Sequence, residues 1–542
     1  MISAEMLLLI SFAAPVALLL ACGWRMVRER MPTLFAFAPL PALATALWAV
    51  NRPPWVFNEA RLHITFVLDM PGAILLGVAA LLWSAAGLYA STYLRGHPNL
   101  GRFSIYWLLT LTGSLGVFVA ADLFTFYLTF ALLSLAAYGL VVFDGTPRAR
   151  RAGIIYLVLA LLGEIFLLMG FVLLASAIPG DSLAIRDALA TLPTSPWRDP
   201  TVALLIAGFG LKMGLVPLHV WLPIAHPAAP MPASAVLSGA IIKAGVIGLI
   251  RFLPSDEALP AAGQLLAIAG FVTAFYGVLV GLTQRHPKAV LAYSSVSQMG
   301  VVAAVLGLGL AAGDGGAGIA AAFYAAHHVL VKGALFLAVG VAAAGAQGRR
   351  GWVLAPALLL CLGLGGLPFT GGAIAKYAVK DFFGTGFTAT LSAASAAGTT
   401  LLMLHFLRRL ALAEVTGAGR APAGLTLPWL VMAVAALLLP WLLYTPAGLG
   451  SAAAALGLEA SWQALWPVAL GAALAFALRG RVDALPAVPE GDIAAGIEPA
   501  ARFTLRLGAG LDGLDRGLRG WTVASVSLVL VAVAIGWTLW PF

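Results

Sequence analysis

This chain of 542 residues is poor in charge, and its charged residues make up only 10% of the sequence. Hydrophobic residues make up 61%, and the mean hydropathy is +0.99. Soluble globular domains carry about 25% charged residues, so the composition excludes that class. The apolar runs are about as long as the roughly 20 residues that a helix needs to cross a bilayer. We therefore expect an all-α polytopic membrane protein.

Cysteine is nearly absent, since Cys22 and Cys361 are the only two and both lie in apolar runs. Two thiols cannot supply the four ligands of a typical iron–sulfur or structural zinc site. Phosphate-binding loops, dinucleotide fingerprints and zinc-type histidine spacings are also missing from the sequence. We therefore expect no cofactor, and any redox or hydrolytic centre should belong to a partner chain. The net charge of +9 is not arranged in a basic, aromatic-rich patch, which argues against nucleic acid.

Lysine occurs only six times, and four of the six lie inside long apolar stretches. Arginine supplies most of the remaining positive charge and falls in short polar gaps. Arginine stays protonated in proteins, whereas a buried lysine can release its proton. Lysines placed within the bilayer therefore indicate a protein that moves protons through a membrane.

The apolar runs predict about sixteen membrane spans. They lie near residues 4–22, 32–50, 70–93, 104–121, 123–143, 152–176, 201–222, 232–252, 262–282, 289–311, 316–345, 353–383, 387–406, 427–445, 461–479 and 520–540. Gaps after odd-numbered runs hold most of the arginines, so these gaps should face the cytoplasm and both termini the outside. Arg25 follows the first run instead of preceding it, which favours an uncleaved span over a lipoprotein signal. A multi-pass protein of a bacterial inner membrane is expected.

Two of these runs contain a proline near glycines and a lysine, at Pro217 in the seventh and Pro368 in the twelfth. Helix breaks at membrane depth are tolerated where protein or water satisfies the freed backbone groups. Their separation by five spans predicts two inverted five-helix repeats with broken seventh and twelfth helices. The expected parts are residues 1–103 (spans 1–3), 104–252 (first half-channel), 262–406 (second half-channel) and 427–542. Residues 480–519 should form an amphipathic surface helix, or else a solvated connector.

Inserting an ionisable residue at mid-bilayer costs at least about 2.5–3.5 kcal/mol of free energy. Each ionisable residue within the predicted spans therefore needs an explanation. Glu164 lies in the sixth span and Lys212 in the seventh, and a Glu–Lys pair would lower this cost and create a proton site. In the eleventh span His328 and Lys332 share one helical face. The predicted proton relay is Glu164, Lys212, Lys243, His328, Lys332 and Lys376.

A second group of residues is assigned an accessory role in proton movement. It consists of His219, His226, His327, Asp122, Lys380 and Asp381. His219 and His226 flank Pro217 near the predicted inner surface, and Asp122 stands where a helix cap is as good an explanation as function. For any single buried lysine, a structural ion pair is the alternative, but four lysines in four spans favour a relay.

Four motifs in order along residues 70–410 resemble the signature of the antiporter-like subunits of respiratory complex I, membrane-bound hydrogenases and Mrp-type cation/proton antiporters. They are Lys212–Gly245, Ala292–Gly300, His328–Phe336 and Leu367–Lys376. The resemblance implies a core of fourteen helices, here with two C-terminal additions, in which each inverted repeat forms a half-channel.

The resemblance also implies roles for individual residues. Lys212 and Lys243 match the lysines of the family's seventh and eighth helices, His328 and Lys332 the group that connects the halves, and Lys376 the lysine of the second half-channel. Such a series would pass protonation changes sideways along the membrane midplane. The resemblance also implies that the chain works in a complex with other membrane subunits and a soluble redox partner. The transported ion would be H⁺ or, alternatively, Na⁺.

One position departs from the family pattern. Many members carry a glutamate on the fifth helix, but Ala131 occupies the matching position in Tyr127–Ser134. Glu164 matches an acidic residue that some members carry on the sixth helix, and we expect it to partner Lys212 instead. The leading hypothesis is a proton-translocating or cation/proton-antiporting subunit. The alternatives are the membrane subunit of a bicarbonate or CO₂ uptake complex with a carbonic-anhydrase-like partner, and a structural anchor without transport.

Overall fold

The computed structural model describes residues 3–57, 64–178, 182–346, 350–415 and 417–493, which are mostly helical. Eleven of the described helices are long and apolar enough to cross a membrane, which confirms the predicted class. The chain divides into two units, residues 1–490 and 491–542, and every element below belongs to the first. The sixteenth predicted span and most of the predicted amphipathic helix lie outside the described residues.

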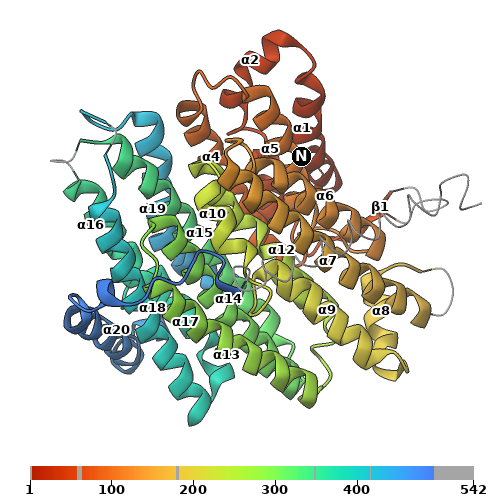
Figure 1. The fold of residues 1–542 in the computed structure, drawn as a ribbon. Helices are drawn as coiled ribbons and strands as arrows, with labels where there is room; N and C mark the ends of the chain where they lie inside the picture. The colour runs from red at the N-terminus through yellow and green to blue at the C-terminus, as the bar shows by residue number, and fades with distance from the viewer. Residues whose placement is uncertain (1–2, 58–63, 179–181, 347–349, 416, 494–542) are drawn as a thin grey trace, which may run out of the picture. The chain divides into compact units, whose positions relative to one another are not determined.

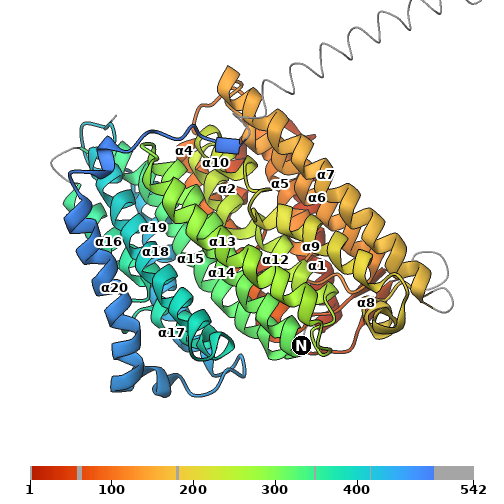
Figure 2. The same cartoon turned by 60° about the horizontal axis from the view of Figure 1, so that its bottom comes forward.

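The long helices follow the predicted spans closely (Figure 1). The eleven candidate spans are α1 (Ala4–Ala21), α4 (Met70–Tyr93), α6 (Leu123–Val141), α7 (Pro147–Ala177), the segment Met231–Phe252, α13 (Pro260–Leu282), α14 (Pro287–Ala312), α15 (Gly316–Ala344), α18 (Phe387–Leu412), α19 (Ala423–Tyr444) and α20 (Leu458–Leu478). The helix α5 (Leu100–Gly116) is shorter. In Figure 2, α5–α7 lie on one side, α13–α15 run through the middle, and α16–α20 lie on the other side. The most apolar segment of α15 is wholly buried.

Several helix starts are set by local chemistry. Asp69, Asp122 and Thr146 precede α4, α6 and α7, and each side chain accepts a hydrogen bond from a backbone N–H of the first turn. Such caps satisfy donors that the helix itself leaves unpaired. The apolar runs therefore begin as helices where the sequence supplies a short polar side chain.

The second predicted span, residues 32–50, is not one helix. It is divided between α2 (Arg25–Leu34) and α3 (Leu40–Trp48), and residues 35–39 form a turn between them. Pro39 and Pro41 lie at the start of α3, where proline is tolerated because its missing N–H is not needed. The arginines assigned to a gap after the first span lie instead on α2, which is a polar helix.

The seventh and twelfth spans are interrupted where predicted. α9 (Arg198–Met213) and α10 (Trp221–Ala228) are separated by Gly214, and α16 (Gly351–Gly365) and α17 (Gly371–Val379) by Gly366. Both glycines have positive φ, 81° and 107°, a conformation that a side chain disfavours. At the first break, the freed N–H of Val216 donates to Thr273 of α13 at 3.1 Å. Neighbouring protein thus satisfies the broken backbone, as membrane depth requires.

One end of the bundle, here named the hairpin end, carries the strands β1 (Trp55–Phe57) and β2 (Ile64–Phe66). Asp122 accepts from the backbone N–H of Thr65 at 2.6 Å. Arg251, at the end of α12 (Lys243–Phe252), bonds to Asp69 at 3.0 Å and to the carbonyl of Ala120 at 2.8 Å. The short helix α8 (Ile185–Thr191) adds a further contact there. These loops are the ones that the arginine pattern assigned to one side.

The opposite end, here named the arginine end, holds the arginine-rich gaps. Arg102 donates to the carbonyl of Phe143 at 2.9 Å, and Arg148 pairs with Glu490 at 2.5 Å. Arg408 and Arg409 both pair with Asp483, which lies just after α20. The alternation of loops between two ends is therefore as predicted.

The helices α13 and α14 meet along a line of glycines, here named the glycine seam: Gly263, Gly270 and Gly277 of α13, with Gly300 and Gly307 of α14. The members recur every seven residues on each helix. A methyl group added at Gly263 would lie 2.3 Å from the backbone nitrogen of Ala311, and one at Gly300 would lie 2.5 Å from that of Ala274. Two helices can approach this closely only because no side chain separates them.

Candidate functional site

The predicted relay residues are buried in the interior of the bundle. Glu164, Lys212, Lys243, His328 and Lys332 are at most 6% exposed, whereas Lys376 is half-buried. Burying an ionisable group costs several kcal/mol unless other polar groups surround it. The described residues place these side chains in three clusters, which differ in their partners.

The first cluster joins α6, α7 and α9. The Nζ of Lys212 donates to the hydroxyl of Ser134 at 2.8 Å, and Glu164 lies within interaction range of both Lys212 and Ser134. No ion pair within 4 Å joins Glu164 to Lys212 among the described residues, and Ser134 is a polar side chain near both. The Oε1 atom of Glu164 has no hydrogen-bond partner in the described part of the chain.

Local structure explains the position of Lys212. It lies in the last turn of α9, where the helix dipole favours a positive charge, immediately before Gly214. Its Nζ also lies 5.3 Å from the ring centroid of Phe130 and 5.9 Å from that of Tyr156, and aromatic faces attract cations at such distances. The cation is thus held beside the helix break without a direct carboxylate partner.

The second cluster is the most compact and joins α12, α14 and α15. The Nζ of Lys243 and the Nδ1 of His328 lie 2.5 Å apart, and Lys243 also donates to the carbonyl of Ser238 at 3.0 Å. Lys332 donates to the carbonyl of Leu291 at 2.9 Å and to the hydroxyl of Ser294. A distance of 2.5 Å leaves room for only one proton between the lysine and histidine nitrogens, since two protonated nitrogens would repel each other.

A distorted turn leads into this cluster. The chain passes through α11 (Met231–Val236) and a π-helical turn at Leu237–Ile241 before α12 begins at Lys243. A π turn adds a residue to one helical turn and is found mostly at functional sites. Here it leaves the carbonyl of Ser238 available to Lys243, and the hydroxyl of Ser238 bonds to that of Ser295 at 2.8 Å.

His226, an accessory residue in the prediction, lies near this cluster. It is 0% exposed, its ring stacks on Phe336 with a centroid distance of 4.7 Å, and it lies within electrostatic range of Lys243, Lys288 and Lys332. Neither ring nitrogen has a hydrogen-bond partner among the described residues. The ring of His226 is therefore enclosed by protein, and its position near the inner membrane surface stays a prediction.

His219 is also buried, at 0% exposure, between the two parts of the broken helix. Its ring contacts the edge of Tyr276, with the centroids 5.0 Å apart, and lies 6.2 Å from that of Tyr293. The break at Gly214 to Val220 therefore turns this imidazole toward α13 and α14.

Lys288 is a buried lysine that the sequence interpretation missed. It begins α14, is 3% exposed, and donates to the carbonyl of Ala229 at 2.5 Å. Next to it, burial and the positive charges of Lys288 and Arg148 lower the pKa of His286 to about 4. Lys288 stands in a polar gap beside Arg285 and His286, so only its position at the start of an apolar run could have indicated burial.

The third cluster surrounds Lys376 in α17. Its Nζ lies 5.8 Å from the ring centroid of Tyr324, whose hydroxyl donates to Gln298 at 2.7 Å, and Gln298 donates to Thr399 at 3.0 Å. His327 packs against the start of α17, since a methyl group at Gly372 would lie 3.1 Å from its ring. Helix α15 carries both Tyr324 and Lys332 and thus connects the second and third clusters.

Three accessory residues lie outside these clusters. Asp122 is buried and caps α6: its two oxygens accept from the N–H groups of Thr125 at 2.7 Å and Thr65 at 2.6 Å. Lys380 and Asp381 are exposed at the end of α17, and the Nζ of Lys380 lies 4.2 Å from the ring centroid of Tyr377. The structure does not bring these three to the clusters.

Ala131 is half-buried on α6, one turn before Ser134. The family's fifth-helix carboxylate would therefore stand one turn from the serine that lies near both Lys212 and Glu164. Within the described residues, no group of three or more histidine, cysteine, aspartate or glutamate side chains is placed to hold a metal ion. The arrangement can hold and exchange protons, and its chemistry is that of amines, imidazoles, hydroxyls and one carboxylate.

Fold and site together define a polytopic α-helical membrane protein with paired helix breaks and a buried series of ionisable groups. The family model described as NADH:quinone oxidoreductase/Mrp antiporter, transmembrane region, matches residues 120–403, more than half of the chain. The chain belongs to this family, as the ordered motifs predicted.

Individual proteins agree with this assignment. Hydrogenase-4 component B of Escherichia coli is 30% identical over 350 residues, covering 60% of this chain and 51% of that protein. NADH-quinone oxidoreductase subunit N of Desulforudis audaxviator is 34% identical over 314 residues, covering 55% of this chain and 61% of that protein. The chain spans about half the length of the first curated relatives it matches.

A solved structure shows the same fold. The Mrp complex from Dietzia sp. DQ12-45-1b matches 99% of this chain and 63% of its own chain with a TM-score of 0.79 at 22% sequence identity. At this identity the match supports the fold alone. The relatives are subunits of multi-subunit membrane complexes.

Proposed function

We propose that this chain moves protons through a membrane as one subunit of a multi-subunit complex. The relay would run from Glu164 and Lys212 to Lys243, His328 and Lys332 and on to Lys376. The observation that carries the proposal is the contact between Lys243 and His328, at 2.5 Å and 0% exposure. Two basic nitrogens that share a proton inside an apolar bundle are suited to proton exchange. Their burial is costly, so stability alone does not explain them.

The helices that carry the clusters support a continuous path. α9 and α12 pack so closely that a methyl group at Gly245 would lie 2.6 Å from the carbonyl of Phe209, one turn from Lys212. α15 then connects Lys332 to Tyr324, which lies beside Lys376. We propose that residues 104–252 and 262–406 are the two half-channels, each with a broken helix beside its lysine.

Two buried groups outside the predicted relay belong in the same proposal. His226 lies in range of three lysines, and both of its ring nitrogens lack a partner among the described residues. Buried polar atoms of this kind usually bond to ordered water, and such water would connect His226 to the second cluster. Lys288 would then link this cluster to the arginine end, where it interacts with Asp144.

The energy source must come from other chains. We propose membrane subunits and a soluble redox subunit as partners in a bacterial inner membrane, by analogy with the relatives, and H⁺ as the transported ion, with Na⁺ as an alternative. Among the described residues, Glu164 is the one carboxylate near the lysine clusters, which favours H⁺ because Na⁺ prefers several oxygen ligands. The bicarbonate-uptake alternative and the structural-anchor alternative stay predictions.

The test is proton movement in sealed vesicles that contain the intact complex. Lys243→Met and Lys332→Met should each lower the rate at least about tenfold, because each removes a proton carrier. Tyr89→Phe is the matched control: it removes a buried polar atom that bonds the carbonyl of Leu337 at 3.4 Å, away from the clusters. Near-normal transport by both lysine variants would refute the relay.

A further inference from the structure

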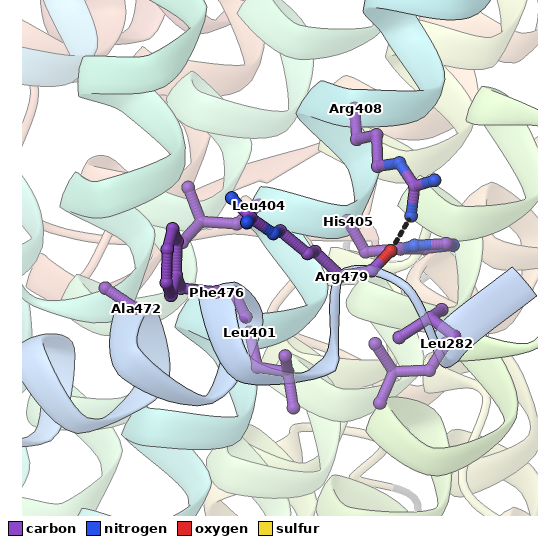
Figure 3. A pocket seen from close by; sticks show the side chains of 10 residues that line it. Leu282, Leu401, Leu404, His405, Arg408, Ala472, Phe476 and Arg479 are labelled. Carbon is purple, nitrogen blue, oxygen red and sulfur yellow. Dashed lines mark hydrogen bonds between the residues drawn. The ribbon is translucent and has the colours of Figure 1, made fainter.

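A pocket lies between α13, α18 and α20 at the arginine end, and its volume is about 340 Å³. This volume is at the lower end of the roughly 300–1,000 Å³ that small-molecule sites enclose. Figure 3 shows the side chains that line it, with Leu401 and Ala472 on facing helices and Arg408 and Arg479 at one end.

The pocket exists because two helices touch and then diverge. Where α18 and α20 cross, a methyl group added at Gly471 would lie 2.3 Å from the carbonyl of Ala397, so the backbones are in contact. Toward the arginine end, Ala472 and Ala475 are too short to fill the widening gap between the helices. Leu282 of α13 forms its floor.

The walls and the rim differ sharply in chemistry. Leucine, alanine and phenylalanine side chains make the walls, and His405, Arg408 and Arg479 stand at the end. The guanidinium of Arg479 lies 4.2 Å from the ring centroid of Phe476 and pairs with no acid among the described residues. Arg408 donates to the carbonyl of Arg479 at 2.6 Å and to Asp483.

Charge at the rim is left partly unbalanced. Arg408 and Arg409 share the single carboxylate of Asp483, so these three residues keep one net positive charge, and Arg479 adds another. An apolar slot that ends in unbalanced arginines matches a molecule with hydrocarbon chains and an anionic head. Basic pockets between membrane helices bind such head groups, and arginine is well suited to phosphate.

We propose that this pocket binds one acyl chain of an anionic phospholipid, with the phosphate held by Arg479 and Arg408. The lipid would fill the gap between α18 and α20 and so attach the C-terminal helix α20 to the bundle. Neither the relay nor the assembly of the complex enters this proposal, so its failure and theirs can be told apart.

The experiment uses the full-length chain, extracted in detergent with its native partners, and native mass spectrometry with added phosphatidylglycerol or phosphatidylcholine. The wild-type chain should retain phosphatidylglycerol preferentially. Arg479→Gln should lower this retention about fivefold, the effect of one arginine near an anionic head group. Arg481→Gln is the matched control, an exposed arginine of the same loop that does not line the pocket.

A second variant tests the apolar wall. Ala475→Phe fills the gap and leaves the arginines in place, so it should lower retention although the rim charge is unchanged. Equal retention of the two lipids, unchanged retention in Arg479→Gln, or displacement by glycerol phosphate without acyl chains would each overturn the proposal. Cross-linking of an Ala475→Cys variant to another protein chain through the new thiol would also overturn it, since a subunit would then occupy the pocket.

Discussion

Ser134 shows how a neutral side chain can connect two ionisable ones. Its hydroxyl accepts from Lys212 at 2.8 Å and lies within interaction range of Glu164, so a change of protonation at Glu164 or Lys212 should affect the other group through this hydroxyl. A direct ion pair would hold its charges more tightly and exchange protons less readily. At this scale the first cluster is a connection through a hydroxyl and not an ion pair.

Removal of this hydroxyl is the sharpest test of this connection. Ser134→Ala should slow proton movement about tenfold, because a hydrogen bond to a charged group contributes about 1.5–3 kcal/mol. The measurement is the rate of internal acidification in sealed vesicles. Ser104→Ala is a matched control, since Ser104 is equally buried but bonds only to the carbonyl of Leu100. Equal rates in the two variants would show that the hydroxyl takes no part.

The residues that the sequence revealed are those whose chemistry contrasts with their surroundings. Lys243, His328 and Lys332 interrupt apolar runs, and the structure places them together. Ser134 gave no such signal, because serine is common in membrane helices and carries no charge. Lys288 was missed for the opposite reason: it stands among polar neighbours, and only the fold of α10 over α14 buries it.

Helix breaks are the elements that place each lysine. At the second break, α17 starts directly against α16: a methyl group at Gly372 would lie 1.7 Å from the carbonyl of Gly363. The side chain of Lys376 lies over the same break, since a methyl group at Gly366 would lie 2.7 Å from its Cδ. The broken element and its lysine are thus one packed unit.

This close approach predicts a strong effect of a single methyl group. Gly372→Ala should lower the thermal unfolding temperature in detergent, because overpacking costs about 1–3 kcal/mol or more. Gly351→Ala, at the start of the same interrupted pair, meets nothing within 4 Å, so it should leave the unfolding temperature unchanged or slightly higher. Similar melting of the two variants would contradict the packing described for α16 and α17.

The contact of Asp483 with α18 predicts a pH dependence. Burial opposes ionisation, but Arg409 and Arg408 outweigh it and hold the pKa of Asp483 below its usual value. A lowered pKa in the folded state stabilises the protein above the unfolded value of about 4, and this stabilisation is lost as pH falls further. Asp483→Asn should therefore melt at a lower temperature than wild type at pH 7, and at nearly the same temperature near pH 3.

A control separates this contact from general acid effects. Glu459→Gln removes an exposed carboxylate whose only hydrogen bond in the described part of the chain is to Gln463. Its difference from wild type should be small at every pH. If the difference for Asp483→Asn grew as the pH fell, the sign of the linkage would be wrong.

For the whole molecule, the alternation of loops between the hairpin end and the arginine end was predictable from arginine positions alone. Spans were predictable because an apolar run of about 20 residues has few other uses. The division of residues 32–50 into α2 and α3 was not predicted, because its apolar content hides the turn before Pro39. The hairpin at Trp55–Phe66 was missed because strands of three residues are too short to show alternation.

Orientation in the membrane remains the prediction at this scale. Both termini should lie outside and the arginine end in the cytoplasm. An epitope tag before Met1 should react with antibody in intact spheroplasts, whereas a tag inserted after Gly145, at the arginine end, should react only after permeabilisation. The reverse result would show that the arginine pattern fails as a guide for this chain.

The glycine seam sets a limit on motion. Since backbone touches backbone at Gly263, Gly270 and Gly277, α13 and α14 cannot rotate or slide past each other without a collision of main-chain atoms. In any transport cycle that opens one half of the bundle and closes the other, α13 and α14 must therefore move together as one rigid unit. Alternation would then be confined to the parts around it: the interrupted helices, the π turn and the side chains that α15 presents.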